Sequence, residues 1–439
     1  MRRLLKNATI VRPYTAIPFL ENGYVVVEGD TISAVGAGLP AGERFDEVID
    51  LEGKIVLPGM INAHTHLYSA LALGMPPPRK PPAGFPEILK QVWWKLDRAL
   101  DSESTRAAFE VGLLNCLRCG VTTIFDHHSS QNFISGSLEL LIATAEKLGV
   151  NISTAFEITD RNGRTGFTSG LSENLSVYKK YQNQKYVHPM LGMHASFTLS
   201  DESLQAIRTA LDTVDQWGIH IHVAEDKIDR DDARSRGYRS IIDRLRRFDL
   251  LNDRSLIIHG LYLEAGDVET IKACGASLVH NPTSNANNRV GLLSTQVINT
   301  LEAGLGTDGM QANMLAEAKE GTLIRSSHLK GGTDNIDYAE LLFKHNPRIA
   351  GRLFGRDIGL IAPGCQADLA VYRCRTGTPV NKANLAGHLL FGWGLPTDVM
   401  TRGRFRIRNQ KFVNLSEEDV LSNARIQSER LWRKMGTIG

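Results

Sequence analysis

The 439-residue chain has no long apolar run, few cysteines and no excess of charge of either sign. No stretch of about 20 apolar residues is present, so a transmembrane helix is not expected. The opening Met1-Arg-Arg-Leu-Leu-Lys leads into no sustained apolar segment, which argues against a signal peptide. Five cysteines, an odd number in a long chain, argue against a disulfide framework. These absences predict a cytoplasmic protein without a membrane partner.

The charges are nearly balanced, with 50 Lys and Arg against 48 Asp and Glu. Basic side chains are scattered apart from a short cluster over residues 230–247, so no nucleic-acid partner is expected. Apolar residues make up 42% of the chain, enough for a large core and more than one small domain needs. The composition therefore favours a partner that is a small-molecule substrate.

The alternation of elements divides the chain into two units. Residues 1–57 read as short β-branched strands, and similar strand patterns return after about residue 355. Between residues 58 and 355, short apolar runs alternate with amphipathic helices such as 101–119, which is typical of a parallel sheet. We predict one catalytic domain over 58–355. Residues 1–57 plus 356–439 should form a small composite β domain that ends in a charged helix, 415–436.

Eight strands are expected in the catalytic part, and each ends at a histidine or an acidic residue. In a (β/α)8 barrel the carboxyl ends of the strands meet at one mouth, where active sites lie. Eight of the 13 histidines lie at these ends, which packing alone does not explain. The sequence therefore predicts an α/β fold, a (β/α)8 barrel, with its site at this mouth. The strands are expected to end near His66, Asp126, Glu157, His194, His222, His259, His280 and Asp308.

A proline-rich stretch over residues 73–86 follows the first of these strands. Its position places it at the mouth, where it can act as a lid or face the substrate. The alternative is a rigid surface loop without a role in binding.

Two histidines, His64 and His66, end the first strand of the barrel. Side chains two residues apart share one face of a strand, so both imidazoles can reach one metal ion. His222 ends the fifth strand, and Glu225 follows it as a carboxylate that can move protons. His220 forms a second His-x-His pair with His222. We favour His222 as the ligand because it lies nearer the strand end, and expect His220 to pack inside the barrel.

Asp308, at the end of the eighth strand, can bind the metal and accept a proton from its water. His259, at the end of the sixth, can hydrogen-bond that water or a substrate atom. Three histidines and one carboxylate leave a position open for water, as in catalytic zinc sites. A divalent metal lowers the pKa of its water toward about 7. Zinc is the expected ion, although iron also fits these ligands.

These motifs resemble those of the amidohydrolase superfamily, in its cytosine-deaminase-like, metal-dependent branch. Further segments, Trp93-Trp-Lys-Leu-Asp97, Asp126-His-His-Ser-Ser130 and His194-Ala-Ser-Phe-Thr-Leu-Ser200, are similar to SsnA-type aminohydrolases. The superfamily motifs occur in family order over most of the chain: Leu57-Pro-Gly-Met-Ile-Asn-Ala-His-Thr-His66, His222-Val-Ala-Glu225, Ile258-His-Gly260, His280-Asn-Pro-Thr-Ser-Asn285, Leu305-Gly-Thr-Asp-Gly309 and Pro363-Gly-Cys-Gln-Ala-Asp-Leu369.

The resemblance implies a distorted barrel, a β-sandwich built from both chain ends, and a homodimer or larger homo-oligomer. It implies one metal ion, because the fourth strand ends in His194 and not in the lysine of the two-metal branch. The expected metal ligands are His64, His66, His222 and Asp308. The expected catalytic groups are Glu225 as proton shuttle, His259 and Asp308. The expected substrate contacts are His194, His280 and His127 or His128, although the last two can instead pack at the mouth.

The expected reaction is hydrolytic deamination of an amino-substituted heterocycle such as a purine, pyrimidine or pterin. A second hypothesis keeps the site and changes the bond, to that of a chloro-triazine or a cyclic amide. A third hypothesis is a catalytically silent, metal-binding protein. Ammonia release from amino-heterocycles distinguishes the first hypothesis from the other two.

Overall fold

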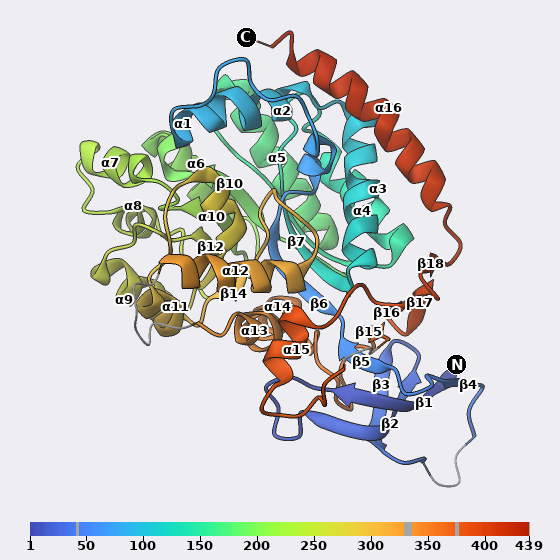
Figure 1. Cartoon of the computed structure of the whole chain (residues 1–439). Helices are drawn as coiled ribbons and strands as arrows, with labels where there is room; N and C mark the ends of the chain where they lie inside the picture. Colours follow the sequence, from blue (N-terminus) through green and yellow to red (C-terminus); the bar gives the residue numbers. More distant parts are fainter. Residues whose placement is uncertain (41–43, 329–335, 374–376, 439) are drawn as a thin grey trace.

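Strands from the two ends of the chain pair in one sheet. We describe a computed structural model in which residues 1–40, 44–328, 336–373 and 377–438 are placed. Strand β5 (Ile55–Pro58) pairs in parallel with β1 (Arg2–Val11) and antiparallel with β15 (Leu369–Tyr372). Sequence-distant segments therefore share one nine-stranded sheet, at the bottom of Figure 1. Its other strands are β2 (Phe19–Glu28), β3 (Thr31–Ala37), β4 (Glu47–Asp50), β16 (Asp398–Thr401), β17 (Arg404–Arg408) and β18 (Lys411–Phe412).

The strands between residues 58 and 355 form two parallel sheets, which confirms the predicted α/β class. Two isolated β-bridges, one between Thr65 and Asp308 and one between Ile158 and Met193, connect the two sheets. The predicted fourth strand is divided at Met190 into two short strands. One sheet contains β6 (Met60–Thr65), β7 (Val121–His128), β8 (Asn151–Phe156) and β9 (Val187–Pro189), and the other contains β10 (Leu191–Ala195), β11 (Ile219–Val223), β12 (Leu256–His259), β13 (Ser277–His280) and β14 (Gly304–Leu305).

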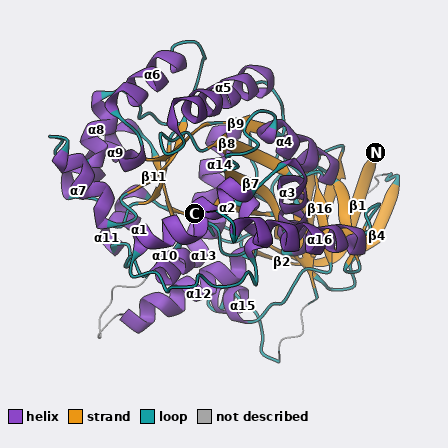
Figure 2. Cartoon of the chain, turned by 90° about the horizontal axis from the view of Figure 1, so that it is seen from above, coloured by secondary structure: helices purple, strands orange, loops and turns teal. Residues whose placement is uncertain are grey.

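Helices surround these strands, as Figure 2 shows from above. Helix α3 (Ser102–Arg118) begins after Asp101, whose side chain accepts the backbone N–H of Ser104, and ends before Gly120 at φ 79°. Its Phe109 and Leu113 pack in the core with Ile124 of β7. The other helices include α4 (Ser137–Leu148), α5 (Gly163–Tyr181), α6 (Asp201–Leu211), α7 (Lys227–Ser235), α8 (Ile241–Arg247), α9 (Ala265–Cys274), α10 (Pro282–Asn288), α11 (Thr295–Leu301), α12 (Met314–His328) and α14 (Asn346–Phe354).

The proline-rich stretch and the C-terminal helix lie on the same side of the catalytic part. Helix α16 (Glu417–Met435) packs against α3 and α2 (Trp94–Ala99), and not against the nine-stranded sheet (Figure 1). The indole N–H of Trp432 donates to the carbonyl of Leu71 at 2.8 Å. Residues 75–80 line a surface hollow beside this helix. Phe85, at the start of α1 (Phe85–Ile88), instead lines a separate cavity together with His66 and Asp308.

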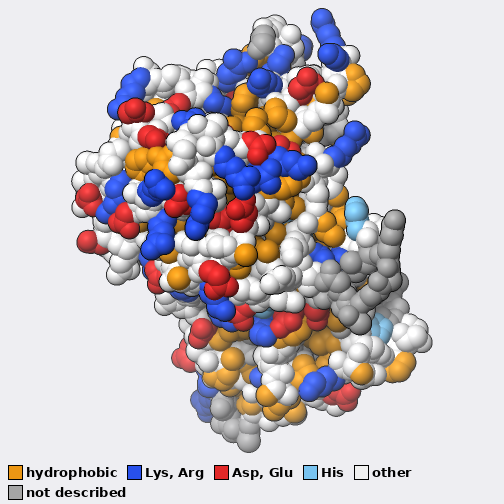
Figure 3. All heavy atoms as spheres, turned by 90° about the vertical axis from the view of Figure 1, so that its left-hand side faces the viewer, with side chains coloured by type: hydrophobic (Ala, Val, Ile, Leu, Met, Phe, Trp, Pro, Cys, Tyr) orange, Lys and Arg blue, Asp and Glu red, His pale blue; other side chains and the backbone are white. Residues whose placement is uncertain are grey.

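The basic cluster at residues 230–247 is paired with acidic side chains. Arg230 contacts Asp231, and Arg247 contacts Asp243, both at about 3 Å. Figure 3 shows basic and acidic side chains interspersed on the face that it presents. Among the described residues, no helix combines the length and apolar character that crossing a membrane requires.

Candidate metal centre and active site

Four side chains from three strand ends converge on one point. His64 and His66 come from β6, His222 from β11, and Asp308 from the turn after β14. One ligand atom from each of the four lies within 4.8 Å of the others. Asp308 Oδ1 is 2.9 Å from His66 Nε2 and 3.5 Å from His64 Nε2. The structure therefore brings together the four predicted ligands.

The hydrogen bonds behind the histidines fix which nitrogen faces the centre. The Nδ1 of His66 donates to the carbonyl of His127 at 2.5 Å, and the Nδ1 of His222 donates to that of His194 at 2.8 Å. A neutral imidazole with a proton on Nδ1 has a lone pair on Nε2. These two Nε2 atoms lie 3.2 Å apart, a repulsive arrangement that a cation between them relieves.

The third histidine completes this set of donors. His64 Nε2 is buried without a hydrogen-bond partner, as expected for an atom that binds a metal. Its Nδ1 lies 2.9 Å from Nε2 of His220, which is fully buried behind the ligand. Three imidazole nitrogens and a carboxylate oxygen match the ligands of a catalytic zinc site.

Burial and the charge of Asp308 act in opposite directions on the histidines of the centre. Burial alone would lower the pKa of His66, but the hydrogen bond and charge of Asp308 outweigh burial and raise it to about 9. His64 is fully buried, and its burial lowers its pKa to about 3 despite the same carboxylate. Asp308 therefore stabilises one positive charge among these imidazoles: without a metal a proton on His66 supplies it, and a bound cation would replace that proton and leave His66 neutral.

Glu225 and His259 stand beside the ligand cluster. Glu225 Oε2 is 3.5 Å from His259 Nε2, which is 3.9 Å from Asp308 Oδ2. Burial and the charge of Asp308 raise the pKa of Glu225 well above its usual range. A carboxyl group with a raised pKa holds a proton more readily, as a proton shuttle requires.

Helix α10 supports these groups with three side chains that sequence reasoning did not assign to the site. The Ser284 hydroxyl donates to Asp308 Oδ2, and Asn288 donates to Glu225 Oε1 at 3.2 Å. Asn285 Oδ1 accepts the Nδ1–H of His259 at 2.8 Å, which leaves Nε2 of His259 as an acceptor toward the site. The sequence after His280 could have predicted these contacts, because positions 284, 285 and 288 lie on one side of a helix.

The backbone is left-handed at three of the functional strand ends. Ala224, His259 and Asp308 have φ values of 53°, 76° and 52°. This region is uncommon for residues other than glycine, and it occurs where surrounding contacts hold the chain. At Ala224 the contact is Asp229, whose Oδ2 accepts the Ala224 N–H at 2.8 Å.

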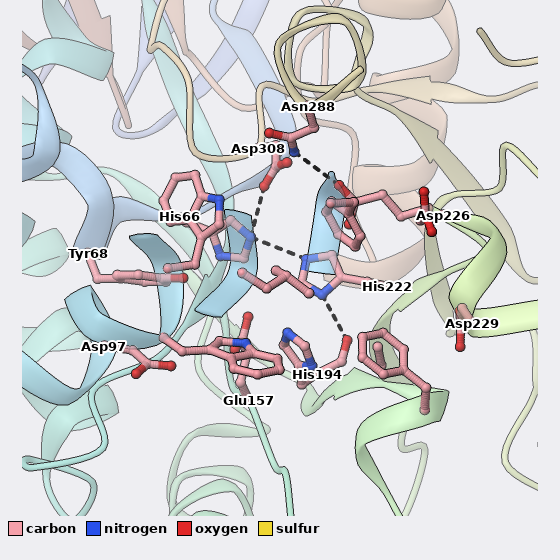
Figure 4. Close-up of a pocket in the computed structure, with 17 residues that line it drawn as sticks. His66, Tyr68, Asp97, Glu157, His194, His222, Asp226, Asp229, Asn288 and Asp308 are labelled. Carbon is pink, nitrogen blue, oxygen red and sulfur yellow. Dashed lines mark hydrogen bonds and ion pairs between the residues drawn. The ribbon is translucent and has the colours of Figure 1, made fainter. Parts of the chain in front are cut away.

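A cavity opens from the ligand cluster toward the mouth. Figure 4 shows His66, His222 and Asp308 along one side of it, with Asp97, Glu157 and His194 across from Asp308. Its apolar wall is formed by Phe85, Leu89, Trp93, Trp94 and Phe197.

One of the four histidines predicted as candidate substrate contacts lines the cavity, and for His127 and His128 the structure favours the alternative of packing. His194 lines the cavity, but His127, His128 and His280 are fully buried behind its wall. His127 Nδ1 lies 3.2 Å from a carboxylate oxygen of Glu157. The ring of His128 packs on Phe109, and that of His280 lies against Tyr338. Neighbouring side chains on a strand point to opposite faces, so nearness to a strand end does not guarantee access to the cavity.

Fold and centre together define a metal-dependent hydrolase. Residues 55–405 match the model of the amidohydrolase family, so the chain belongs to that family. The predicted family and enzyme class, a hydrolase of carbon–nitrogen bonds other than peptide bonds, are thereby confirmed.

Relatives of similar length align with nearly the whole chain. A 5-methylthioadenosine/S-adenosylhomocysteine deaminase of Syntrophomonas wolfei is 25% identical over 98% of this chain and 99% of its own. A 5'-deoxyadenosine deaminase of Methanothrix thermoacetophila is 26% identical over 98% of this chain and 99% of its own. Each of these relatives carries the name of a deaminase.

Solved structures share the fold at lower identity. An adenosine deaminase of Xanthomonas campestris with bound zinc has a TM-score of 0.85 at 20% identity, over 98% of both chains. The zinc complex of atrazine chlorohydrolase from Arthrobacter aurescens has a TM-score of 0.82 at 19% identity, over 97% of this chain and all of its own.

Proposed function

We propose that this chain deaminates an adenine nucleoside or a closely related amino-substituted purine, with one zinc ion in its active site. The observation that carries the proposal is the position of Glu225, a carboxyl group 13% exposed beside three convergent imidazole nitrogens and Asp308. The deaminase relatives that align with nearly the whole chain support an adenine ring as the substrate's reacting part.

The side chains divide the proton transfers among them. When bound, a divalent metal supplies Lewis acidity and makes hydroxide available near neutral pH. Glu225 takes a proton from water and gives it to the ring nitrogen next to the amino-bearing carbon. His259, held by Asn285, accepts a hydrogen bond through Nε2 and orients the attacking water. Asp308 takes the second proton of the attacking water and passes it to the amino group, which leaves as ammonia.

Replacing Glu225 tests this assignment. Glu225→Gln keeps the shape and the contact with Asn288 but cannot carry a proton, so we expect kcat to fall by about 1,000-fold. Metal content, measured by mass spectrometry, should stay at the wild-type level. Full turnover by the metal-loaded variant would contradict the proposed role. Chloride release from a chloro-triazine, without ammonia from any amino-heterocycle, would favour the alternative bond.

The finer architecture is also part of the proposal. The bridges from Thr65 to Asp308 and from Ile158 to Met193 support closure of the two parallel sheets into one distorted (β/α)8 barrel. We propose that the nine-stranded sheet folds into a β-sandwich domain built from 1–57 and 356–439, beside a catalytic domain of 58–355. We further propose that the enzyme is a cytoplasmic homodimer or larger homo-oligomer.

A further inference from the structure

The cavity wall is acidic at both of its ends. Its lining residues include six carboxylates and, among the described residues, no lysine or arginine. A bound divalent metal offsets the charge of the carboxylates near the ligands. Asp97 lies across the cavity from Asp308 in Figure 4, whereas a carboxylate oxygen of Glu157 lies within 4.8 Å of ring nitrogens of His66 and His222. A bound metal would therefore offset the charge of Asp97 less than that of Glu157. The six are Asp97, Glu157, Glu225, Asp226, Asp229 and Asp308.

Asp97 has an unused hydrogen-bond acceptor. Its side chain is 2% exposed, and its Oδ2 accepts from Arg161 at 3.2 Å and from the Ser129 hydroxyl at 3.4 Å. Its Oδ1 is buried without any hydrogen-bond partner. A buried acceptor without a donor is costly, so a group that lines a cavity in this state is suited to receive a donor from a ligand.

The nearest guanidinium is already engaged. Arg161 bonds Asp97, lies 3.8 Å from a carboxylate oxygen of Glu157 and stacks on the ring of Trp94 at 4.6 Å. It is not one of the residues that line the cavity. An anionic substituent on a substrate would therefore meet carboxylates at this end, with no free cation to balance it.

We propose that this cavity selects its substrate by charge: it takes an amino-purine whose far substituent is uncharged or cationic and donates a hydrogen bond to Asp97, and it excludes substrates that carry a phosphate there. The inference rests on the proposed deaminase function and adds the substrate class. The apolar wall of Trp93, Trp94 and Phe197 holds the ring, and the acidic end selects what is attached to it.

A matched set of adenine nucleosides tests this selection. The zinc-loaded enzyme is assayed for ammonia release from adenosine, adenosine 5'-monophosphate and 5'-amino-5'-deoxyadenosine. We expect kcat/KM for the monophosphate to be at least about 100-fold below that for adenosine, because like charges oppose each other in a buried site. The kcat/KM for the cationic amine should equal or exceed that for adenosine. A kcat/KM for the monophosphate within tenfold of that for adenosine would overturn the inference.

Binding separates this inference from the proposed function. Calorimetry with zinc-loaded Glu225→Gln enzyme measures Kd for the same three compounds without turnover. One outcome would contradict the deaminase function but support charge selection. In that outcome, adenosine and the amine have a much lower Kd than the monophosphate, but the wild-type enzyme releases no ammonia. Equal binding of adenosine and the monophosphate, or binding of none of the three, would overturn the selection.

A charge-neutral substitution locates the selective group. Burial raises the pKa of Asp97 to about 7, so the comparison is made at pH 8, where this carboxyl group is mostly ionised. Asp97→Asn keeps an acceptor oxygen but removes that negative charge, so we expect the preference for adenosine over its monophosphate to shrink by about tenfold. Asp212→Asn is the matched control, since this exposed carboxylate pairs with Arg208 away from the cavity. An unchanged preference in Asp97→Asn, at normal metal content, would contradict the role of Asp97.

Discussion

At the scale of single residues, the position of the proton-carrying group depends on one buried hydrogen bond. Glu225 follows Ala224, which is left-handed, and Asp229 holds the Ala224 N–H. Burial raises the pKa of Asp229 to about 7, so this carboxyl group is partly protonated near neutral pH. The hydrogen bond that it accepts, more than its charge, fixes the turn.

A pair of substitutions at Asp229 separates these contributions. Asp229→Ala removes the acceptor and lets Ala224 relax, so we expect kcat to fall by about 10- to 100-fold through misplacement of Glu225. Asp229→Asn keeps an acceptor oxygen and should recover most of the activity. Steady-state kinetics at wild-type metal content measure both. Equal losses in the two variants would show that the charge is what matters.

At the scale of elements, helix α10 holds the two proposed catalytic groups, Glu225 and His259, by hydrogen bonds. Asn288→Ala removes the donor to Glu225, and Asn285→Ala removes the acceptor of His259. We expect each to lower kcat by about tenfold, the cost of one hydrogen bond to a catalytic group. Ala286→Ser, at an exposed position of the same helix, is the control and should leave kcat unchanged. A similar loss in the control would indicate damage to the helix itself.

At the scale of the whole molecule, several buried carboxyl groups make stability depend on pH. Burial raises the pKa of Glu317 to about 7, from 4.5 in the unfolded chain. The folded state therefore binds the proton more tightly, and the free energy of unfolding falls as pH rises from about 4.5 to 7. Between pH 5 and pH 8, we expect the free energy of unfolding of Glu317→Gln to fall by about 2 kcal/mol less than that of the wild type. Denaturant unfolding at both pH values measures this, and equal losses would contradict it.

Metal binding should also stabilise the whole fold, because the ligands come from strands far apart in sequence. A chelator should abolish activity and lower the thermal midpoint, and zinc should restore both. Metal analysis should find one ion per chain. His64→Ala should lose the ion and the response to zinc, whereas two ions per wild-type chain would contradict a single-metal centre.

The sequence by itself determined the α/β class and the family, and it predicted the four residues that converge as a candidate metal site. Ligands such as His64 and His66 are readable because a strand places alternate residues on one face, and parallel strands end at one edge. The deaminase chemistry followed from the same motifs. These features depend on local periodicity and chain order, which a single sequence contains.

Only the tertiary structure decided which side chains reach the cavity. His127, His128 and His280 lie at strand ends yet turn behind the wall, whereas Asp97 and Trp94, outside the parallel strands, line it. The contacts of α10 with the catalytic groups and the packing of α16 on α3 also escaped prediction. Each depends on how elements distant in sequence pack together, and no periodicity within one segment encodes that arrangement.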